Sequence, residues 1–139
     1  MVLDMKSSHG AVVGFGLWTF GHIGVLAVYR TTLILKGDVA PNGFGPSRDD
    51  SSKSFIGRVG RSHANCTENF PLFLATVVLN TLTGGPDISS LSWYYVCARM
   101  GHSTSHCLGD TDIHATIRFL FFGTQIGLLG NMLYKTIKE

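Results

Sequence analysis

The sequence predicts an all-α integral membrane protein that folds as an antiparallel four-helix bundle. Three observations indicate this fold: four long apolar segments, a low charged fraction, and connections rich in glycine, proline and aspartate. Only 14% of the 139 residues are charged and 45% are hydrophobic, whereas soluble domains are typically about 25% charged. The length allows a single domain, residues 1–139. A soluble bundle of buried helices is the alternative fold.

The four apolar segments have the lengths that membrane helices require. They run approximately over residues 11–35, 66–83, 91–108 and 115–134. A helix needs about 20 mainly apolar residues to span a bilayer, so the first and fourth segments are long enough alone. The second and third reach that length only if their polar ends continue the helix. The first segment is too long to be the apolar core of a cleaved signal peptide.

The connections between the segments predict the topology. Residues 36–57 form one long polar loop, and residues 84–87 and 109–112 predict short turns. Basic residues gather in and beside the long loop: Lys36, Arg48, Lys53, Arg58 and Arg61. Because loops rich in lysine and arginine stay on the cytoplasmic side, we expect this loop in the cytoplasm and both termini on the opposite side.

A charged stripe runs into the second apolar segment. Its members lie at offsets of 0, 3, 7 and 10 along the chain, and they are Arg58, Arg61, Asn65 and Glu68. At about 100° per residue in a helix, these side chains fall within an arc of roughly 80°. Ionisable residues in a membrane helix are costly without a polar partner, so they mark a candidate binding site. Two cations and one anion suit a ligand that carries carboxylates and an ammonium group.

The third and fourth segments carry polar faces of their own. One face comprises Arg99, His102 and His106, and the other comprises His114, Arg118 and Gln125. On a helix the members of each face lie within roughly 60° of one another. Together with the stripe, these faces point four arginines inward against one glutamate, so a polyanionic ligand would relieve the imbalance. Glutathione has suitable chemistry, because it carries two carboxylates and an ionisable thiol.

The charged stripe resembles the signature of the membrane-associated proteins in eicosanoid and glutathione metabolism (MAPEG). The family pattern is Arg-x-x-Arg-x-(His or Gln)-x-Asn-x-x-Glu, followed by an apolar stretch with proline. In this chain its positions are Arg58, Arg61, His63, Asn65, Glu68 and Pro71. The run from Asn65 to Thr76 is similar to the branch that contains leukotriene-C synthase. The resemblance implies a homotrimer with sites between subunits, glutathione as co-substrate, and a lipophilic electrophile or lipid hydroperoxide as acceptor.

The resemblance also implies roles for individual side chains. The glutathione-binding set would be Arg30, Arg58, Arg61, His63, Asn65, Glu68, Arg99, His102 and His106. Catalytic members have tyrosines where this chain has His102 and His106, which is a departure from the pattern. In those relatives an arginine near the start of the fourth helix stabilises the glutathione thiolate. Arg118 is the candidate here, if a few extra residues are allowed around 109–112. For Arg30 and Arg58, contact with lipid headgroups is the alternative role.

These features predict a membrane-bound glutathione transferase or peroxidase. A non-enzymatic relative that binds a lipid or fatty acid is the alternative, which the two histidines favour and the retained charges oppose. A structural membrane protein without a ligand would leave the charges unexplained. The net charge of +2 is too small to indicate a nucleic-acid partner. The expected location is the plasma membrane of a bacterium or the endoplasmic reticulum of a eukaryote.

The remaining histidine and cysteine residues carry weaker signals. His22 lies within the first apolar segment and is expected to be an interhelical hydrogen-bond partner. The three cysteines are Cys66, Cys97 and Cys107. They show no metal or redox spacing, so we expect buried free thiols. No metal site is expected at His102 and His106, because they lack a carboxylate on their helix and Arg99 would repel a cation.

Overall fold

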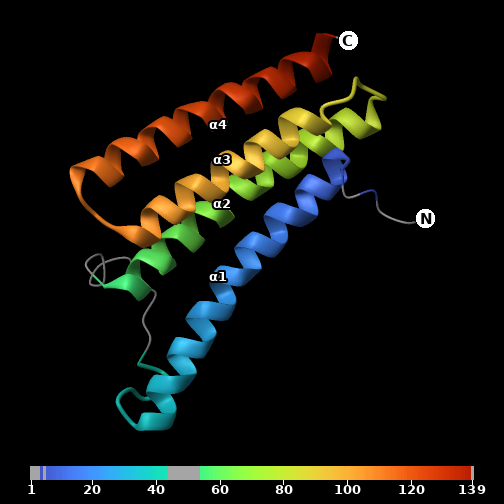
Figure 1. The fold of residues 1–139 in the computed structure, drawn as a ribbon. Coiled ribbons are helices and arrows are strands. Elements are labelled where there is room, and N and C mark those ends of the chain that lie inside the picture. The colour runs from blue at the N-terminus through green and yellow to red at the C-terminus, as the bar shows by residue number, and fades with distance from the viewer. Residues whose placement is uncertain (1–3, 5, 44–53, 139) are drawn as a thin grey trace.

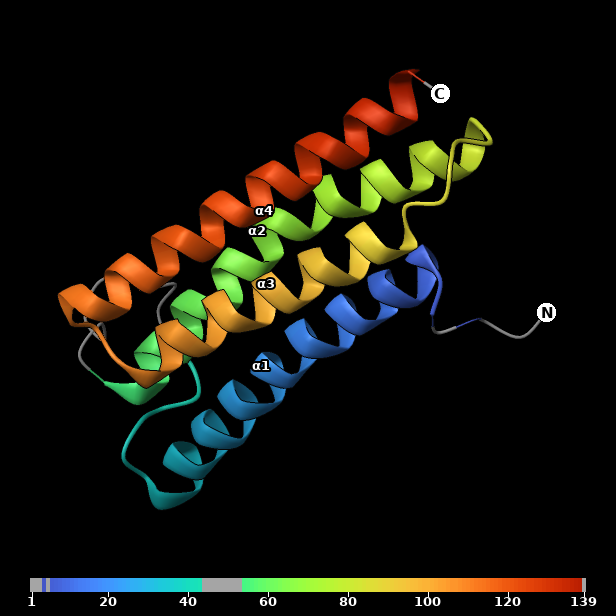
Figure 2. The same ribbon diagram turned by 45° about the horizontal axis from the view of Figure 1, so that its top comes forward.

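The computed structural model describes residue 4 and residues 6–43 and 54–138. This described part of the chain contains four helices and no strand. The helices are α1 (Ser8–Lys36), α2 (Phe55–Leu82), α3 (Ser89–Leu108) and α4 (Asp112–Lys138). Consecutive helices run antiparallel, as Figure 1 and Figure 2 show. The predicted all-α class is therefore confirmed for the described residues.

The pair α2 and α3 forms the centre of the bundle. The helix α4 packs mainly on α3, α1 packs on α2 and α3, and α1 does not contact α4 within the described residues. All buried residues of α1 lie between Ser8 and His22. Toward Lys36 this helix diverges from its neighbours (Figure 1). Only the first half of α1 therefore contributes to the core.

Local sequence signals fix the ends of the first two helices. The Ser7 hydroxyl caps α1 by accepting from the N–H of Gly10 at 3.2 Å, and the Ser54 hydroxyl caps α2 by accepting from the N–H of Gly57 at 3.1 Å. The helix α1 ends at Gly37, whose φ of 78° is a left-handed conformation that glycine adopts without strain.

The helix α2 begins well before the apolar segment that starts at residue 66, so the whole charged stripe is helical. The predicted loop 36–57 is correspondingly shorter, because residue 36 ends α1 and residues 55–57 open α2. Residues 44–53 of that loop lie outside the described residues. They include Arg48 and Lys53, on which the predicted orientation partly depends.

An aromatic cluster forms the core near the α2–α3 turn. Phe73 and Tyr95 stack with ring centroids 4.6 Å apart, and Phe15 packs against Phe73 at 5.8 Å. The buried polar side chains here also find partners, since Asn80 Oδ1 accepts from the Thr136 hydroxyl at 3.0 Å. We call this region, defined by these five residues, the aromatic half of the bundle.

The outward faces of the bundle are strongly apolar. Large exposed apolar side chains include Leu17, Phe20, Val28, Leu35, Ile113, Phe119, Leu120, Ile126 and Ile137. Such extended apolar surfaces are rare on soluble monomers and mark contact with a membrane or another chain. Among the described helices, α1 alone is long and apolar enough to pass as a membrane span by itself. The arrangement with four spans stays a prediction.

Candidate anion-binding site

The candidate site centres on Arg99, a side chain of α3 that is 0% exposed. Its Nη1 donates to the side-chain oxygen of Asn65 on α2 and lies 3.5 Å from Nδ1 of His102. Its Nε and Nη2 have no hydrogen-bond partner among the described residues. No described carboxylate forms an ion pair with it. A buried cation without an anion is destabilising, so this position favours an anionic ligand.

Two histidines of α3 lie beside Arg99. His102 is buried, and its ring meets that of His106 edge-on, with 5.0 Å between centroids and 72° between planes. Nδ1 of His106 and Nε2 of His63 are buried without a hydrogen-bond partner in the described part of the chain. The sequence predicted that Arg99, His102 and His106 share one face, and the structure brings them together. Their ring nitrogens can donate to or accept from polar groups of a ligand.

Asp110, in the turn between α3 and α4, holds two further arginines. Its Oδ2 lies 3.5 Å from Nη2 of Arg61 on α2, and its Oδ1 lies 3.3 Å from Nη2 of Arg118 on α4. Arg118 also donates from Nη1 to the carbonyl of Gly109 at 3.1 Å. The guanidinium of Arg61, and then that of Arg118, hold the pKa of the Asp110 carboxyl below its ordinary value. The two ion pairs of Asp110 therefore link the α3–α4 turn to α2 and to α4.

These two groups belong to one cluster. Arg61, Arg99, Arg118 and Asp110 all lie close enough to His106 to act on it electrostatically. Three guanidiniums and one carboxylate therefore act electrostatically on this histidine, and the formal charge of these groups is positive. We call this region, defined by these five residues, the arginine half of the bundle. Its chemistry suits a ligand with more than one negative charge.

Three predicted site residues have other surroundings. Arg58 is half-buried, and its Nε donates to the carbonyl of Cys107 at 3.0 Å, which stabilises the C-terminal end of α3. Arg30 is exposed on the diverging half of α1, and Glu68 is exposed on α2. The structure therefore leaves Arg30 and Glu68 on the surface of the protomer, outside the buried cluster.

A buried hydrogen-bond network joins α1, α2 and α3 beside the cluster. His22 Nδ1 donates to the carbonyl of Trp18 at 2.9 Å, and its Nε2 lies 3.0 Å from the hydroxyl of Ser62. Cys66 Sγ lies 3.2 Å from the hydroxyl of Ser103. The interhelical role predicted for His22 is confirmed. Single serines within a helix carry no spacing signal, so sequence reasoning missed Ser62 and Ser103.

The expectation of buried thiols is wrong for one of the three cysteines. The three cysteines are free, and Cys66 is buried and Cys107 half-buried, but Cys97 is exposed. The expectation of buried thiols is wrong for Cys97, because it lies on the outer face of α3. The sequence placed Asp110 in a turn, as the structure does, but gave no indication of its ion pairs. These ion pairs join this turn residue to arginines on two different helices, α2 and α4, which no local pattern reveals.

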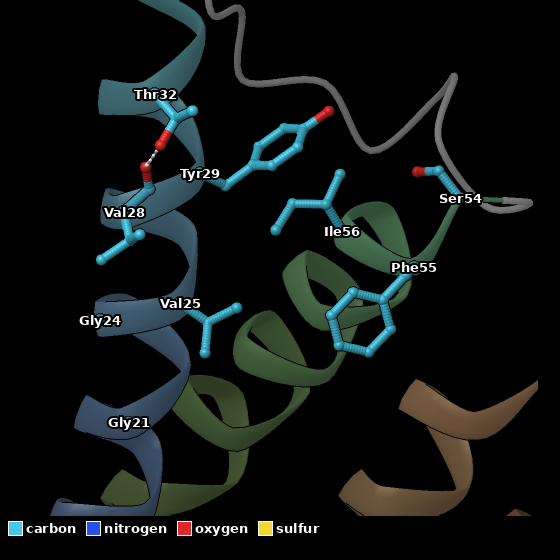
Figure 3. A pocket seen from close by; sticks show the side chains of 9 residues that line it. All are labelled: Gly21, Gly24, Val25, Val28, Tyr29, Thr32, Ser54, Phe55 and Ile56. Atoms are coloured by element: carbon cyan, nitrogen blue, oxygen red, sulfur yellow. Dashed lines mark hydrogen bonds between the residues drawn. The ribbon is translucent and has the colours of Figure 1, made fainter.

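An apolar groove of about 700 Å³ lies between the diverging half of α1 and the start of α2 (Figure 3). Its lining residues are Gly21, Gly24, Val25, Val28, Tyr29, Thr32, Ser54, Phe55 and Ile56. None of the predicted glutathione ligands is among them. A mainly apolar groove of this size suits an acyl chain or another lipophilic group.

The family comparison covers the part of the chain that carries the charged stripe and the arginine cluster. The profile of the MAPEG family matches residues 8–138, which include all four helices. The chain belongs to the MAPEG family. MAPEG proteins are membrane-associated and act in glutathione and eicosanoid metabolism, and the family contains both glutathione transferases and non-enzymatic members. No individual curated protein matches the chain.

Proposed function

We propose that this MAPEG protein is a membrane-bound glutathione transferase, with peroxidase activity on lipid hydroperoxides as the related reaction. The observation that carries the proposal is the fully buried Arg99, whose Nε and Nη2 lack partners in the described part of the chain. With Arg61 and Arg118 it makes a cluster that two carboxylates and a thiolate would neutralise. Members of the family commonly use glutathione.

Each charged group of glutathione has a counterpart in the proposed site. The carboxylates would pair with Arg61 and Arg99, and the ammonium group with Glu68. The remaining proposed ligands are Arg30, Arg58, His63, Asn65, His102 and His106. Because Arg30 and Glu68 are exposed on the protomer, they would complete a site only against a neighbouring copy. This placement supports a homotrimer with its sites between subunits.

Arg118 is proposed to activate the thiol of glutathione. A free thiol with a pKa of about 8.5 is mostly protonated at neutral pH, and a nearby guanidinium stabilises the thiolate. The thiol proton leaves to water, sulfur forms a bond to the electrophilic carbon, and the leaving group departs with its bonding electrons. With a lipid hydroperoxide, two glutathione molecules are oxidised to the disulfide while the hydroperoxide is reduced to an alcohol and water.

The proposal places all four helices across a membrane. The helices contain 29, 28, 20 and 27 residues, and about 20 residues span the hydrocarbon core. The exposed apolar faces of α1 and α4 would then contact lipid or neighbouring subunits. With the α1–α2 connection in the cytoplasm and the termini on the opposite side, the arginine half lies near the cytoplasmic surface, where glutathione is abundant.

Thermal unfolding of the detergent-purified protein tests the binding step. Glutathione at ten times its dissociation constant should stabilise the fold by about 1.4 kcal/mol, whereas triglycine, which lacks the thiol and the glutamate group, should have little effect. The catalytic step is tested by formation of the conjugate between glutathione and a reactive aryl halide. The absence of both effects at saturating glutathione would contradict the proposal.

A non-enzymatic lipid-binding protein is the second candidate. The apolar groove between α1 and α2 favours it, and so does the presence of His102 and His106 at the tyrosine positions. A Cβ added at Gly24 would meet nothing within 4 Å, and Gly24 lines the groove, so Gly24→Leu is expected to extend into the groove and to leave the fold intact. If a fluorescent fatty acid binds the wild type but not Gly24→Leu, and glutathione binds neither, the lipid-binding function replaces the transferase.

A further inference from the structure

We infer that Asp110 is an internal competitor for the ligand: in the ligand-free protein its carboxylate occupies the anion site between Arg61 and Arg118. An anionic group of glutathione must displace it to bind there. This inference rests on the proposed function, because it names a residue that regulates access to the same site. It assigns to a turn residue a role that neither the charged stripe nor the helix faces indicated.

The geometry resembles a bound ligand more than a surface ion pair. The two carboxylate oxygens of Asp110 face different helices, since Oδ2 approaches Arg61 on α2 and Oδ1 approaches Arg118 on α4. A free carboxylate placed between two guanidiniums would make the same two contacts. The side chain comes from the short turn that joins α3 to α4 (Figure 2).

The contact is open enough to be exchanged. The side chains of Asp110, Arg61 and Arg118 are 40%, 32% and 15% exposed. Ion pairs with this degree of exposure contribute little to stability, because water solvates the separated charges. An incoming carboxylate or thiolate therefore replaces Asp110 at low energetic cost. Arg99 differs, because its guanidinium is fully buried and has no carboxylate of the described chain beside it.

The charge balance predicts the direction of the effect. While Asp110 is in place, part of the positive charge of the cluster is already neutralised. A ligand then binds only the fraction of molecules in which the carboxylate has moved away, and its apparent affinity falls by that fraction. Neutralising the side chain should remove this competition and tighten binding.

Asp110→Asn tests the inference in the full chain, purified in detergent. Isothermal titration should show glutathione binding about 3- to 30-fold more tightly than in the wild type, since two partly exposed ion pairs no longer compete. Asp112→Asn is the matched control. It removes a carboxylate two residues away that is not part of the two described ion pairs, and it should leave the affinity at the wild-type value.

Three results would overturn the inference. Equal glutathione affinity in the wild type and Asp110→Asn would show that the carboxylate does not compete. Weaker binding would make Asp110 a positioning residue for the arginines. Failure of Asp110→Asn to fold would show that the fold requires the ion pairs of this carboxylate, so that no ligand can displace it.

Inorganic sulfate separates this inference from the proposed function. If Asp110 competes for an anion site, sulfate should raise the melting temperature of Asp110→Asn more than that of the wild type or of Asp112→Asn. Such a result without any glutathione binding supports the competitor role of Asp110 and contradicts the transferase. Equal glutathione binding and equal sulfate effects in all three proteins contradict the competitor role and leave the transferase intact.

Discussion

The aromatic half and the arginine half of the bundle bury their side chains in different ways. Phe15, Phe73 and Tyr95 pack against one another, and the polar groups Asn80 and Thr136 pair with each other. In the arginine half, by contrast, Arg99 and His106 keep buried nitrogens that have no partner in the described part of the chain.

The difference indicates that the aromatic half mainly stabilises the fold, whereas the arginine half is suited to bind a ligand. A natural core satisfies its buried polar groups almost completely, and the aromatic half follows that rule. Buried groups without partners are tolerated where something else supplies the missing contacts. Among the described residues, Trp18 and Gln125 also keep one unpartnered buried atom each, but Arg99 alone keeps two.

The largest effect is expected in the aromatic half. Phe73→Ala should lower the free energy of unfolding by about 3–5 kcal/mol, because it opens a cavity under the stacked Tyr95 ring. The exposed neighbour Leu72 is the control, and Leu72→Ala should change stability by less than about 1 kcal/mol. Glutathione affinity of the folded fraction should stay near the wild-type value. A large loss of affinity in Phe73→Ala would show that the two halves are not independent.

The next largest effect concerns catalysis through Arg118. If its guanidinium stabilises the thiolate, Arg118→Ala should slow conjugation by about 100-fold while glutathione affinity changes only a few fold. The ultraviolet absorbance of the bound thiolate should disappear as well. Arg118→Lys should recover part of the rate, because it keeps the charge and loses the planar fork.

A catalytically silent Arg118→Ala would contradict this role. His102→Ala and His106→Ala would then show whether a histidine has taken over thiol activation. If both of these variants are silent too, the chain binds its ligand without chemistry.

The contrast between the halves was partly visible in the sequence. Helical periodicity was enough to place Arg61 with Asn65 on one face, and Arg99 with His102 on another, because these signals are local. The link between the faces was not visible. Asp110 contacts an arginine on each of two other helices, and such pairings depend on how the helices pack. For the same reason, residues 11–35 formed one apolar segment in the sequence, interrupted only by His22 and Arg30, although all buried residues of α1 lie in its first half.

A smaller effect is expected when the buried cation is removed. Arg99→Met has similar length and no charge, so the unfolding free energy without ligand should stay unchanged or rise by about 1 kcal/mol. Stabilisation by glutathione should be lost. Lys135→Met, on the half-buried C-terminal turn of α4, is the control and should keep the response to glutathione. If Arg99→Met instead loses about 3 kcal/mol or more, Arg99 is already compensated within the fold, and the arginine half is not incomplete.

The smallest effect compares Asp110 with Asp87, which lies in the α2–α3 turn beside the aromatic half. Arg61 and Arg118 lower the pKa of Asp110 through their charges, whereas hydrogen bonds from Ser89 lower the pKa of Asp87 in the α2–α3 turn. A carboxylate with a lowered pKa in the folded state stabilises the fold above its ordinary pKa of 3.8. That contribution disappears as the pH falls through the folded-state pKa.

The stability difference between the wild type and Asp110→Asn, and that between the wild type and Asp87→Asn, should therefore both shrink below about pH 4. At neutral pH the two stability differences should respond differently to salt. About 1 M salt screens charges beyond about 3 Å but leaves a local hydrogen bond intact. Chemical unfolding at low and high salt should show the Asp110 difference shrinking and the Asp87 difference persisting. Equal salt sensitivity of the two would mean that the Asp110 contacts are ordinary turn hydrogen bonds, and the electrostatic distinction between the two halves would not hold.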